Sequence, residues 1–283
     1  MPLARVLLKY LSWLLSPLHG RTDEKVIILM YHRVTGDLDL ELDLSASDFE
    51  SQMRWLASTG RVLALDEAIR RVTDRDLGGR TWYVITFDDA YEDFYYRVLP
   101  LVRELALPVA LYVPTGFIDE PAKPPISRSV RDAVRLKPVT WSQLEEIAAC
   151  PLMTIGAHTH SHREMPSLSD TEVLADVQRC DETLARRLGV PVRHFAYPRG
   201  VWNERVERLL AGRYETIALV GGGWLLPSTF DPLRLHRVPV KRSDGMRWFR
   251  ARLAGRLRLE EQLIRWAKRL RRRLVGVAFG RWA

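Results

Sequence analysis

The chain has 283 residues, 47% of them hydrophobic and 28% charged, and a formal net charge of +8. This is ordinary globular composition, which excludes a disordered or collagen-like chain. Two cysteines, Cys150 and Cys180, are too few for a disulfide framework, and the absence of a Cys-x-x-Cys pair excludes a zinc ribbon or a thioredoxin-like site. A reducing compartment is the natural inference.

The N-terminal segment has leucines at helical spacing across residues 3–18, but Arg5, Lys9 and Pro17 interrupt its apolar character. It fits neither a spanning helix of about 20 apolar residues nor a signal peptide with a clean apolar centre. Three interpretations stay open: a helix packed on the body of the protein, a membrane-surface helix, or an uncleaved anchor.

From residue 26 onward, short apolar runs alternate with helical patterns. The runs predicted as buried strands are Val26–Tyr31, Arg61–Leu65, Tyr83–Phe87, Val109–Val113, Met153–Ala157, His194–Ala196 and Thr216–Val220. The helical patterns are Ser47–Ser58, Glu92–Ala106, Trp141–Ala149, Ser169–Leu188 and Asn203–Leu210. This alternation is typical of a parallel sheet covered by helices. About seven such units favour an α/β fold with a closed or nearly closed β/α barrel, and the pattern leaves an open sheet as the alternative. Residues 120–138, with four prolines, are predicted as an inserted loop or lid.

Chemically reactive side chains follow four of the predicted strands. In a β/α barrel the carboxyl ends of the strands meet at one rim, so these side chains are expected to lie together. They come from the segments Tyr31-His32, Asp88-Asp89, His158-Thr159-His160-Ser161-His162 and Tyr197-Pro198-Arg199-Gly200.

The adjacent carboxylates Asp88 and Asp89 have two interpretations. Neighbouring side chains at a strand end diverge, so one carboxylate can bind a cation while the other stays free as a base. The alternative is that an Asp caps the helix that follows.

The segment from His158 to His162 holds three of the seven histidines of the chain. His158 and His162 can converge on one ion, and neutral imidazole is the commonest nitrogen ligand of zinc. Two histidines with one carboxylate and open positions are typical of a catalytic metal site. The alternative is a solvated polar loop, and at this stage either Asp88 or Asp89 could supply the carboxylate.

These segments resemble the polysaccharide deacetylase family, also called carbohydrate esterase family 4 or the NodB-homology family. The resemblance covers residues 25–240, in the order of the family, and is nearest to its exopolysaccharide-deacetylase branch. It rests on Thr86-Phe87-Asp88-Asp89-Ala90-Tyr91, on His158-Thr159-His160-Ser161-His162 and on Phe195-Ala196-Tyr197-Pro198-Arg199-Gly200, supported by Ile28–Val34, Leu107–Phe117 and Thr140-Trp141.

The resemblance implies a distorted (β/α)7–8 barrel and a metal-dependent hydrolase that removes an N-acetyl or other N-acyl group from a sugar. By motif position, Asp88 corresponds to the catalytic base, and Asp89, His158 and His162 to ligands of a divalent metal, most often Zn²⁺. The backbone N–H of Arg199 corresponds to the donor that holds the oxyanion. The substrate implied is a glycan or a lipid-linked sugar.

Three positions depart from the pattern of the family. Ala90 replaces its usual Gly, which is tolerable unless the φ angle there is positive. Ala196 stands where many members carry the Arg that steadies the base, and Arg199 is a candidate to compensate. The late His that protonates the leaving amine has no clean match, and His236 is the candidate in that stretch, with a surface His as the alternative.

Further residues are expected around the substrate rather than in the chemistry. His32, on the predicted rim, is assigned a substrate-side or supporting role, together with Tyr197, Pro198 and Trp141. His160, between the two metal-ligand candidates, is expected to be an outward-facing spacer.

The C-terminal segment carries the positive charge of the protein. Residues 241–283 contain fourteen Lys and Arg against three Asp and Glu, whereas residues 1–240 contain 29 against 32. From Met246 the pattern is helical and amphipathic, with a basic maximum over residues 268–273, which is typical of membrane-surface binding. A helix packed on the barrel and RNA binding are the alternatives, although no RNA-binding motif accompanies the charge.

We therefore expect three segments: an apolar amphipathic segment (1–24), a deacetylase domain (25–240) and a basic helical tail (241–283). The expected location is the cytoplasmic face of the inner membrane as a peripheral protein, with an anchored or exported protein as alternatives. Nucleic acid is not an expected partner. The competing functions are a carbohydrate-binding pseudoenzyme on the same barrel and a membrane or nucleic-acid adaptor driven by the tail.

Overall fold

The structure is a computed structural model that describes residues 3–15, 24–121, 124–125, 135–189, 191–221, 223–264 and 266. The chain divides into two compact units. Thr22–Arg242 form the first, here called the barrel unit. The two ends, Met1–Arg21 and Ser243–Ala283, together form the second, here called the terminal unit. Segments treated separately in the sequence analysis, the N-terminal segment and the basic tail, thus belong to one unit.

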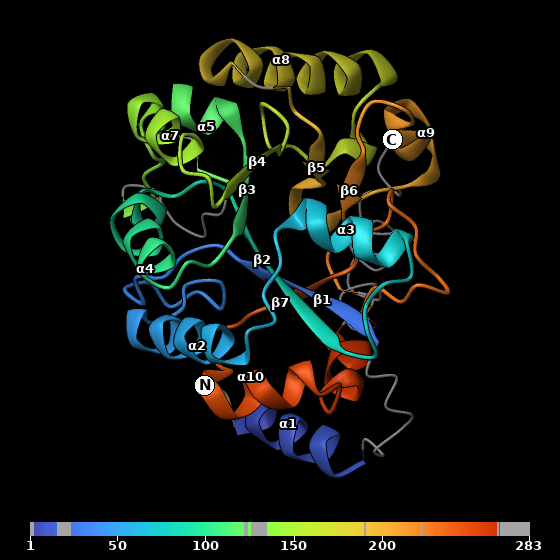
Figure 1. The fold of residues 1–283 in the computed structure, drawn as a ribbon. Helices are drawn as coiled ribbons and strands as arrows, with labels where there is room; N and C mark the ends of the chain where they lie inside the picture. Colours follow the sequence, from blue (N-terminus) through green and yellow to red (C-terminus); the bar gives the residue numbers. More distant parts are fainter. Residues whose placement is uncertain are drawn as a thin grey trace, which may run out of the picture. The chain divides into compact units, whose positions relative to one another are not determined.

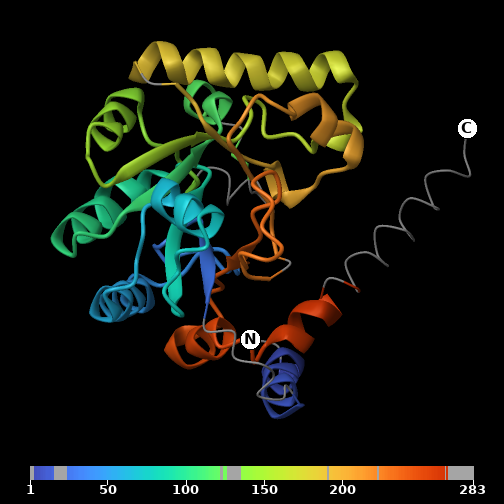
Figure 2. The ribbon, with the colours of Figure 1, turned by 45° about the vertical axis from the view of Figure 1, so that its right-hand side comes forward.

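Seven parallel strands form the sheet of the barrel unit, in the order β6-β5-β4-β3-β2-β1-β7. A parallel bridge between Ala218 and Leu235 joins β6 to the segment that leads into β7, so the sheet is a nearly closed barrel. The predicted barrel is confirmed (Figures 1 and 2). The strands are β1 Lys25–Tyr31, β2 Thr81–Asp88, β3 Val109–Val113, β4 Met153–Ala157, β5 His194–Ala196, β6 Thr216–Ala218 and β7 Arg237–Pro239.

Helices connect the strands and pack against the sheet (Figure 1). The α-helices are α2 Ala46–Thr59, α3 Leu65–Thr73, α4 Leu99–Glu104, α5 Thr115–Asp119, α7 Trp141–Ala148, α8 Asp170–Leu188 and α9 Glu204–Leu210. Helix α8 begins with the predicted capping box between Ser169 and Glu172 and ends at Gly189 in the left-handed conformation.

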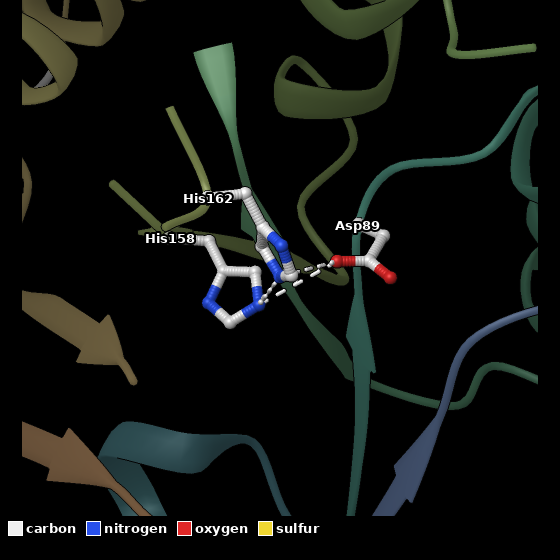
Figure 3. Close-up of side chains that lie close together, drawn as sticks. All are labelled: Asp89, His158 and His162. Carbon is white, nitrogen blue, oxygen red and sulfur yellow. Dashed lines mark hydrogen bonds and ion pairs between the residues drawn. The ribbon is translucent and has the colours of Figure 1, made fainter. Parts of the chain in front are cut away.

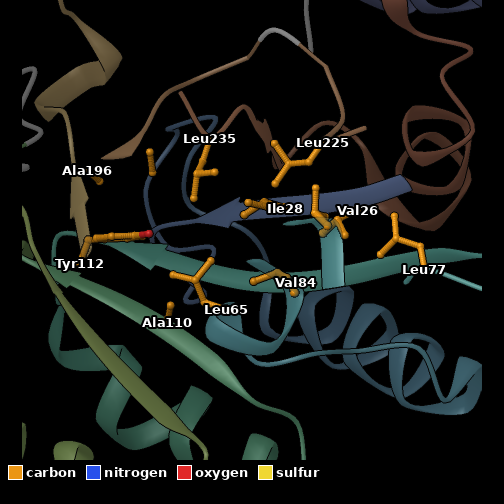
Figure 4. Close-up of a cluster of buried hydrophobic side chains, with 13 residues drawn as sticks. Val26, Ile28, Leu65, Leu77, Val84, Ala110, Tyr112, Ala196, Leu225 and Leu235 are labelled. Carbon is orange, nitrogen blue, oxygen red and sulfur yellow. The ribbon is translucent and has the colours of Figure 1, made fainter. Parts of the chain in front are cut away.

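The inner face of the sheet is packed with side chains that alternate along the strands. Val84, Thr86 and Asp88 share one face of β2 because side chains two apart point the same way. Small residues on neighbouring strands leave room for Tyr112 of β3, and Gly156 is required there, since a Cβ would lie 2.6 Å from the Tyr112 ring. The inner cluster is Val26, Ile28, Leu65, Ala68, Val72, Leu77, Val84, Ala110, Tyr112, Ala196, Ala218, Leu225 and Leu235 (Figure 4).

The outer face of β1 and β2 packs against helices through aromatic rings. Tyr31 stacks on Phe87 at 5.2 Å between ring centroids, and Phe49 of α2 meets both rings edge-on. Phe94 also meets Phe87 edge-on, at 5.1 Å between ring centroids. These contacts fix the end of β2, and therefore the position of the two carboxylates that follow Phe87.

One sequence prediction in this region is corrected. Arg61–Leu65 is not a strand: a single bridge joins Val62 to Tyr83, and Leu65 begins α3, whose Leu65, Ala68 and Val72 are buried at helical spacing. The helix predicted over 92–106 is present over 92–104, with a π-helical stretch, Phe94–Val98, ahead of α4. The predicted loop over 120–138 lies largely outside the described residues.

The terminal unit contains α1, Leu3–Leu15, and α10, Gly245–Leu253, followed by a turn and helical residues 258–264. The tail is thus helical as predicted up to Ile264, with an interruption at 254–257. The basic maximum over 268–273 lies outside the described residues. In the part of the chain that the structure describes, no helix is long and apolar enough to cross a membrane.

Candidate metal centre

The parallel register brings the carboxyl ends of the strands to one edge of the sheet. Tyr31 is level with Phe87, Asp88 with Tyr112, and Val113 with Ala157. The residues that follow these strand ends, including His32, Asp89 and His158, therefore lie on the same rim of the barrel.

Asp89, His158 and His162 form a compact cluster at this rim (Figure 3). The Oδ1 atom of Asp89 lies 3.5 Å from Nε2 of His158 and 3.2 Å from Nε2 of His162, and the two Nε2 atoms are 3.2 Å apart. Ligands at about 2.0–2.1 Å from one tetrahedral ion are separated by about 3.3–3.4 Å. The three atoms thus have the mutual spacing that such an ion requires.

The tautomer of His158 is set by a neighbouring strand. Its Nδ1 lies 2.7 Å from the carbonyl oxygen of Ala196 at the end of β5, so Nδ1–H donates there and the lone pair of Nε2 faces the cluster. Burial lowers the pKa of His158 to about 4, because Asp88 only partly offsets the loss of hydration. The ring is therefore neutral near pH 7, as a metal ligand must be.

The carboxylate of Asp89 is the least satisfied polar group of the cluster. It is 1% exposed, and neither oxygen accepts a hydrogen bond of normal geometry from the described residues. Burial acts to raise the pKa of Asp89, but His162 and His32 outweigh it and hold the pKa well below its usual value. A buried carboxylate that accepts no hydrogen bond of normal geometry, beside the neutral imidazole of His158 and the imidazole of His162, fits a divalent cation.

Asp88, one residue earlier, is satisfied by the protein itself. Its Oδ1 and Oδ2 accept bidentate hydrogen bonds from Nη1 and Nη2 of Arg237, at 2.6 and 2.7 Å. Arg237 is fully buried and also donates to Thr86 Oγ1 and to the carbonyl oxygen of Leu219. Asp88 shares the inner face of β2 with Thr86, whereas the positive φ angle of Asp89, 75°, turns the chain toward the histidines.

Arg237 keeps Asp88 ionised. Burial acts to raise the pKa of Asp88, but the guanidinium and His158 outweigh it and place the pKa below its ordinary value. Asp88 is therefore a carboxylate at neutral pH, able to accept a proton without being a cluster ligand.

The backbone of the cluster is strained. Asp89, Ala90, Thr159 and His162 have φ angles of 75°, 51°, 63° and 52°, in the left-handed region that disfavours side chains. Each such residue costs on the order of 1–3 kcal/mol and persists where the surroundings fix it. Ala90 stands in place of the usual Gly of the family and has a positive φ angle. This is the case in which replacement of the Gly was expected to cause strain.

Four predicted substrate-side residues occupy different places. The Nδ1 of His32 is buried without a hydrogen-bond partner among the described residues, and His32 lowers the pKa values of both carboxylates. Tyr197 and Pro198 are buried just after β5. The indole of Trp141 donates to Asp119 at 3.0 Å and lies beside Arg187, and no described contact joins it to the cluster.

Three other predicted positions differ from the expectation. The side chain of Arg199 is 56% exposed and lies 3.7 Å from Glu164, so it does not compensate for the missing Arg of the third motif; Arg237 does. His236 points Nδ1 at the carbonyl oxygen of Gly221, on the opposite face from Arg237. His160 is not an outward spacer: it is buried, with Nδ1 2.9 Å from Thr115 Oγ1.

Arg237 is the functional candidate that sequence reasoning missed. A signal was present, because an arginine inside the apolar stretch of Leu235, Val238 and Val240 is expected to be buried and therefore to need a buried partner. The replacement Arg proposed from the sequence, Arg199, lies within the third motif.

The fold and the site define an α/β barrel with a candidate metal centre at the carboxyl ends of its strands. A family model described as polysaccharide deacetylase matches residues 75–214. The chain belongs to the polysaccharide deacetylase family.

Curated relatives with related names match part of the chain. The poly-beta-1,6-N-acetyl-D-glucosamine N-deacetylase of Escherichia coli strain K12 is 29% identical over 127 residues, which cover 43% of this chain and 18% of that protein. The protein of the same name from Staphylococcus aureus strain MSSA476 is 23% identical over 170 residues, covering 57% of this chain and 55% of that protein. The matches thus span at most about half the length of these two relatives.

Among solved structures, IcaB from Ammonifex degensii is similar in fold. It superposes with a TM-score of 0.68 at 21% identity, covering 83% of this chain and 97% of that chain. The likeness shows a shared barrel.

Proposed function

We propose that the protein hydrolyses the N-acetyl group of an amino sugar within a glycan, using a divalent metal ion. The observation that carries the proposal is the pairing of two adjacent buried carboxylates in different states. Asp89 faces two imidazoles without a hydrogen-bond donor, and Asp88 is held ionised by Arg237. One is suited to hold a cation and the other to accept a proton.

The residues that would hold the ion are Asp89 through Oδ1 and His158 and His162 through Nε2. When bound, a divalent ion supplies Lewis-acid polarisation of the amide carbonyl and lowers the pKa of water. Three protein ligands leave positions open for water and substrate, which is the pattern of catalytic zinc sites. Zn²⁺ is therefore the ion we propose.

Asp88 supplies the acid–base chemistry. It accepts a proton from the attacking water as the oxygen bonds to the amide carbon, and the protonated carboxyl then holds the proton that the departing nitrogen needs. Arg237 keeps Asp88 ionised and therefore available as a base, and because it lowers the pKa of Asp88, the protonated carboxyl returns its proton readily. The C–N bond breaks, and the products are acetate and a free amino sugar.

The proposed substrate class is a glycan that contains N-acetylglucosamine, as a polymer or a lipid-linked precursor. The support is the name of the two relatives, which describes deacetylation of such a polymer in those proteins. The buried Arg237 donates to Asp88, to Thr86 and to the carbonyl oxygen of Leu219, so we assign substrate selection to other rim residues, among which we place His32, Tyr197 and Pro198.

The test is acetate release by the full chain from short β-1,6-linked N-acetylglucosamine oligomers and from an undecaprenyl-linked N-acetylglucosamine. Each substrate is assayed after chelation and after return of Zn²⁺. The proposal predicts release that chelation abolishes and Zn²⁺ restores. Binding of the oligomers without acetate release at any metal concentration would favour a carbohydrate-binding pseudoenzyme and contradict the proposal.

A further inference from the structure

Helix α1 of the terminal unit exposes a stripe of leucines and buries two polar residues, while its Val6, Leu8 and Trp13 are half-buried. Leu7, Leu11 and Leu14, spaced as one stripe, are 61%, 49% and 69% exposed, and Leu15 beside them is also exposed. Lys9 and Ser12 on the other side of the helix are both fully buried. A surface helix of a water-soluble protein has the opposite arrangement.

The buried side of α1 is held by a polar network, so its orientation is specific. The ammonium group of Lys9 donates to Asp244 Oδ1 at 2.7 Å and to the carbonyl oxygen of Ser243 at 2.7 Å. The hydroxyl of Ser12 donates to the carbonyl oxygen of Arg256 and accepts from the backbone N–H of Glu260. Turning α1 to bury its leucines would break these bonds and leave buried charges unpaired.

Asp244 and Glu260 are joined by Arg252, which completes this network. Its guanidinium contacts Asp244 at 2.9 Å, Glu260 at 3.0 Å and Glu261 at 2.7 Å. These are the three acidic residues of the terminal unit, and Lys9 and Arg252 contact all of them. The acidic side chains of the unit thus form ion pairs with Lys9 and Arg252 inside the unit.

The terminal unit as a whole is strongly basic. It contains fifteen Lys and Arg against three Asp and Glu. One cation lies beside the leucine stripe: Arg247 donates to the hydroxyl of Tyr10 at 2.9 Å and stacks on its ring. Trp266 of the same unit is 63% exposed, and Trp is enriched at membrane interfaces.

We propose that the leucine stripe of α1 (Leu7, Leu11, Leu14 and Leu15) is a docking surface for an anionic phospholipid bilayer. The leucines insert among the acyl chains at the headgroup boundary, and the basic residues of the terminal unit other than the buried Lys9 and Arg252 meet the anionic headgroups. A second copy of the chain is a poor occupant, because two units of such positive charge repel each other. This surface is independent of the deacetylase chemistry proposed above.

The test measures cosedimentation of the full chain with phosphatidylcholine vesicles, with and without phosphatidylglycerol. The variant Leu11→Glu/Leu14→Glu should bind anionic vesicles about 100-fold more weakly, since each buried leucine contributes about tenfold. Leu174→Glu, the same change at an exposed leucine of α8, is the matched control and should leave binding unchanged. Binding of the parent chain should weaken between about 0.1 and 1 M salt as screening increases.

Several results would overturn the proposal. These are a parent chain that does not sediment with anionic vesicles, equal binding to neutral vesicles, or a double variant that binds like its parent. A fall in the melting temperature of the double variant without vesicles would mean that protein, not lipid, covers the leucines. Acetate release from soluble oligomers should be the same in all variants, so loss of that activity would bear on the proposed function instead.

Discussion

Asp89 in the barrel unit and Asp244 in the terminal unit are both buried carboxylates in dense polar clusters, and they differ in their partners. Asp244 is contacted by the ammonium group of Lys9 and the guanidinium of Arg252, and both its oxygens accept hydrogen bonds. Asp89 has two imidazole nitrogens as neighbours and no hydrogen-bond donor of normal geometry among the described residues. A buried carboxylate therefore does not by itself indicate a functional site. What distinguishes Asp89 is that no Lys or Arg contacts it among the described residues.

Asp88 stands between these two cases. It has one cation, Arg237, bound through both oxygens, and it lies next to Asp89 in the chain. The cation stabilises its charged form without occupying the rim. Asp89, which no Lys or Arg contacts among the described residues, is suited to bind a metal ion. Asp88, with one such partner, is suited to act as a base, and Asp244, with two, is suited to stabilise the fold.

The largest effect is expected from removing a residue of the Asp89, His158 and His162 cluster. His158→Ala removes one of three candidate ligands, so we expect loss of bound metal and of both effects of the ion on the reaction. Turnover should fall by more than about 10⁴-fold. Acetate release and metal content after dialysis are the measurements, with His160→Ala as the neighbouring control. Retention of metal and turnover by His158→Ala would contradict the assignment.

Asp88→Asn separates the base from the ligands. It should lower turnover by roughly 10²–10⁴-fold while metal stays bound. It also leaves Arg237 buried without its partner, which costs about 3–5 kcal/mol of unfolding free energy. The double variant Asp88→Asn/Arg237→Met should recover part of that stability but none of the turnover, as measured by urea unfolding and acetate release. Full activity of Asp88→Asn would exclude it as the base.

Arg237→Gln should shift the pH dependence of kcat/KM. Arg237 lowers the pKa of Asp88, so its removal raises that pKa, and a larger fraction of Asp88 is protonated at low pH. The base works only as the carboxylate, so the acidic limb of the profile should move to higher pH. A purely structural role would lower stability without moving that limb.

Asp244→Asn tests the other side of the comparison. It leaves Lys9 and Arg252 with less counter-charge in a buried network, so the terminal unit should lose about 3–5 kcal/mol of stability. Acetate release from soluble oligomers should stay within about twofold, because Asp244 pairs with Lys9 and Arg252 of the terminal unit and is not part of the candidate metal centre. A large loss of turnover with the fold intact would mean that the two clusters are not separate in function.

The smallest effect is expected at Ala90. Ala90→Gly relieves the positive φ of 51° but removes a buried methyl group, so a net stabilisation of up to about 1 kcal/mol is expected. Turnover should not change. Thermal unfolding measures the effect, and a clear destabilisation would show that the methyl packing outweighs the strain.

Local patterns predicted most of the barrel and the candidate metal residues. Strands such as Val109–Val113 are continuous apolar runs, and Asp89, His158 and His162 lie within short motifs at strand ends. The prediction of a strand over Arg61–Leu65 was wrong because periodicity does not distinguish a short apolar run before a helix from a strand.

Contacts between distant parts of the chain could not be predicted in the same way. Arg237 is 149 residues from Asp88, and barrel closure alone brings them together. Lys9 is 235 residues from Asp244, and this pair decides which side of α1 is buried. The leucine spacing predicted the helix correctly, but it gave no information on which side of the helix faces outward.

The central claim is that Asp89 is a metal ligand and Asp88 is not. The most direct measurement is the zinc content of the parent chain, Asp88→Asn and Asp89→Asn after identical loading and dialysis. We predict one tightly held ion per chain in the parent and in Asp88→Asn, and none in Asp89→Asn. Metal retained by Asp89→Asn and lost from Asp88→Asn would reverse the two roles and contradict the account.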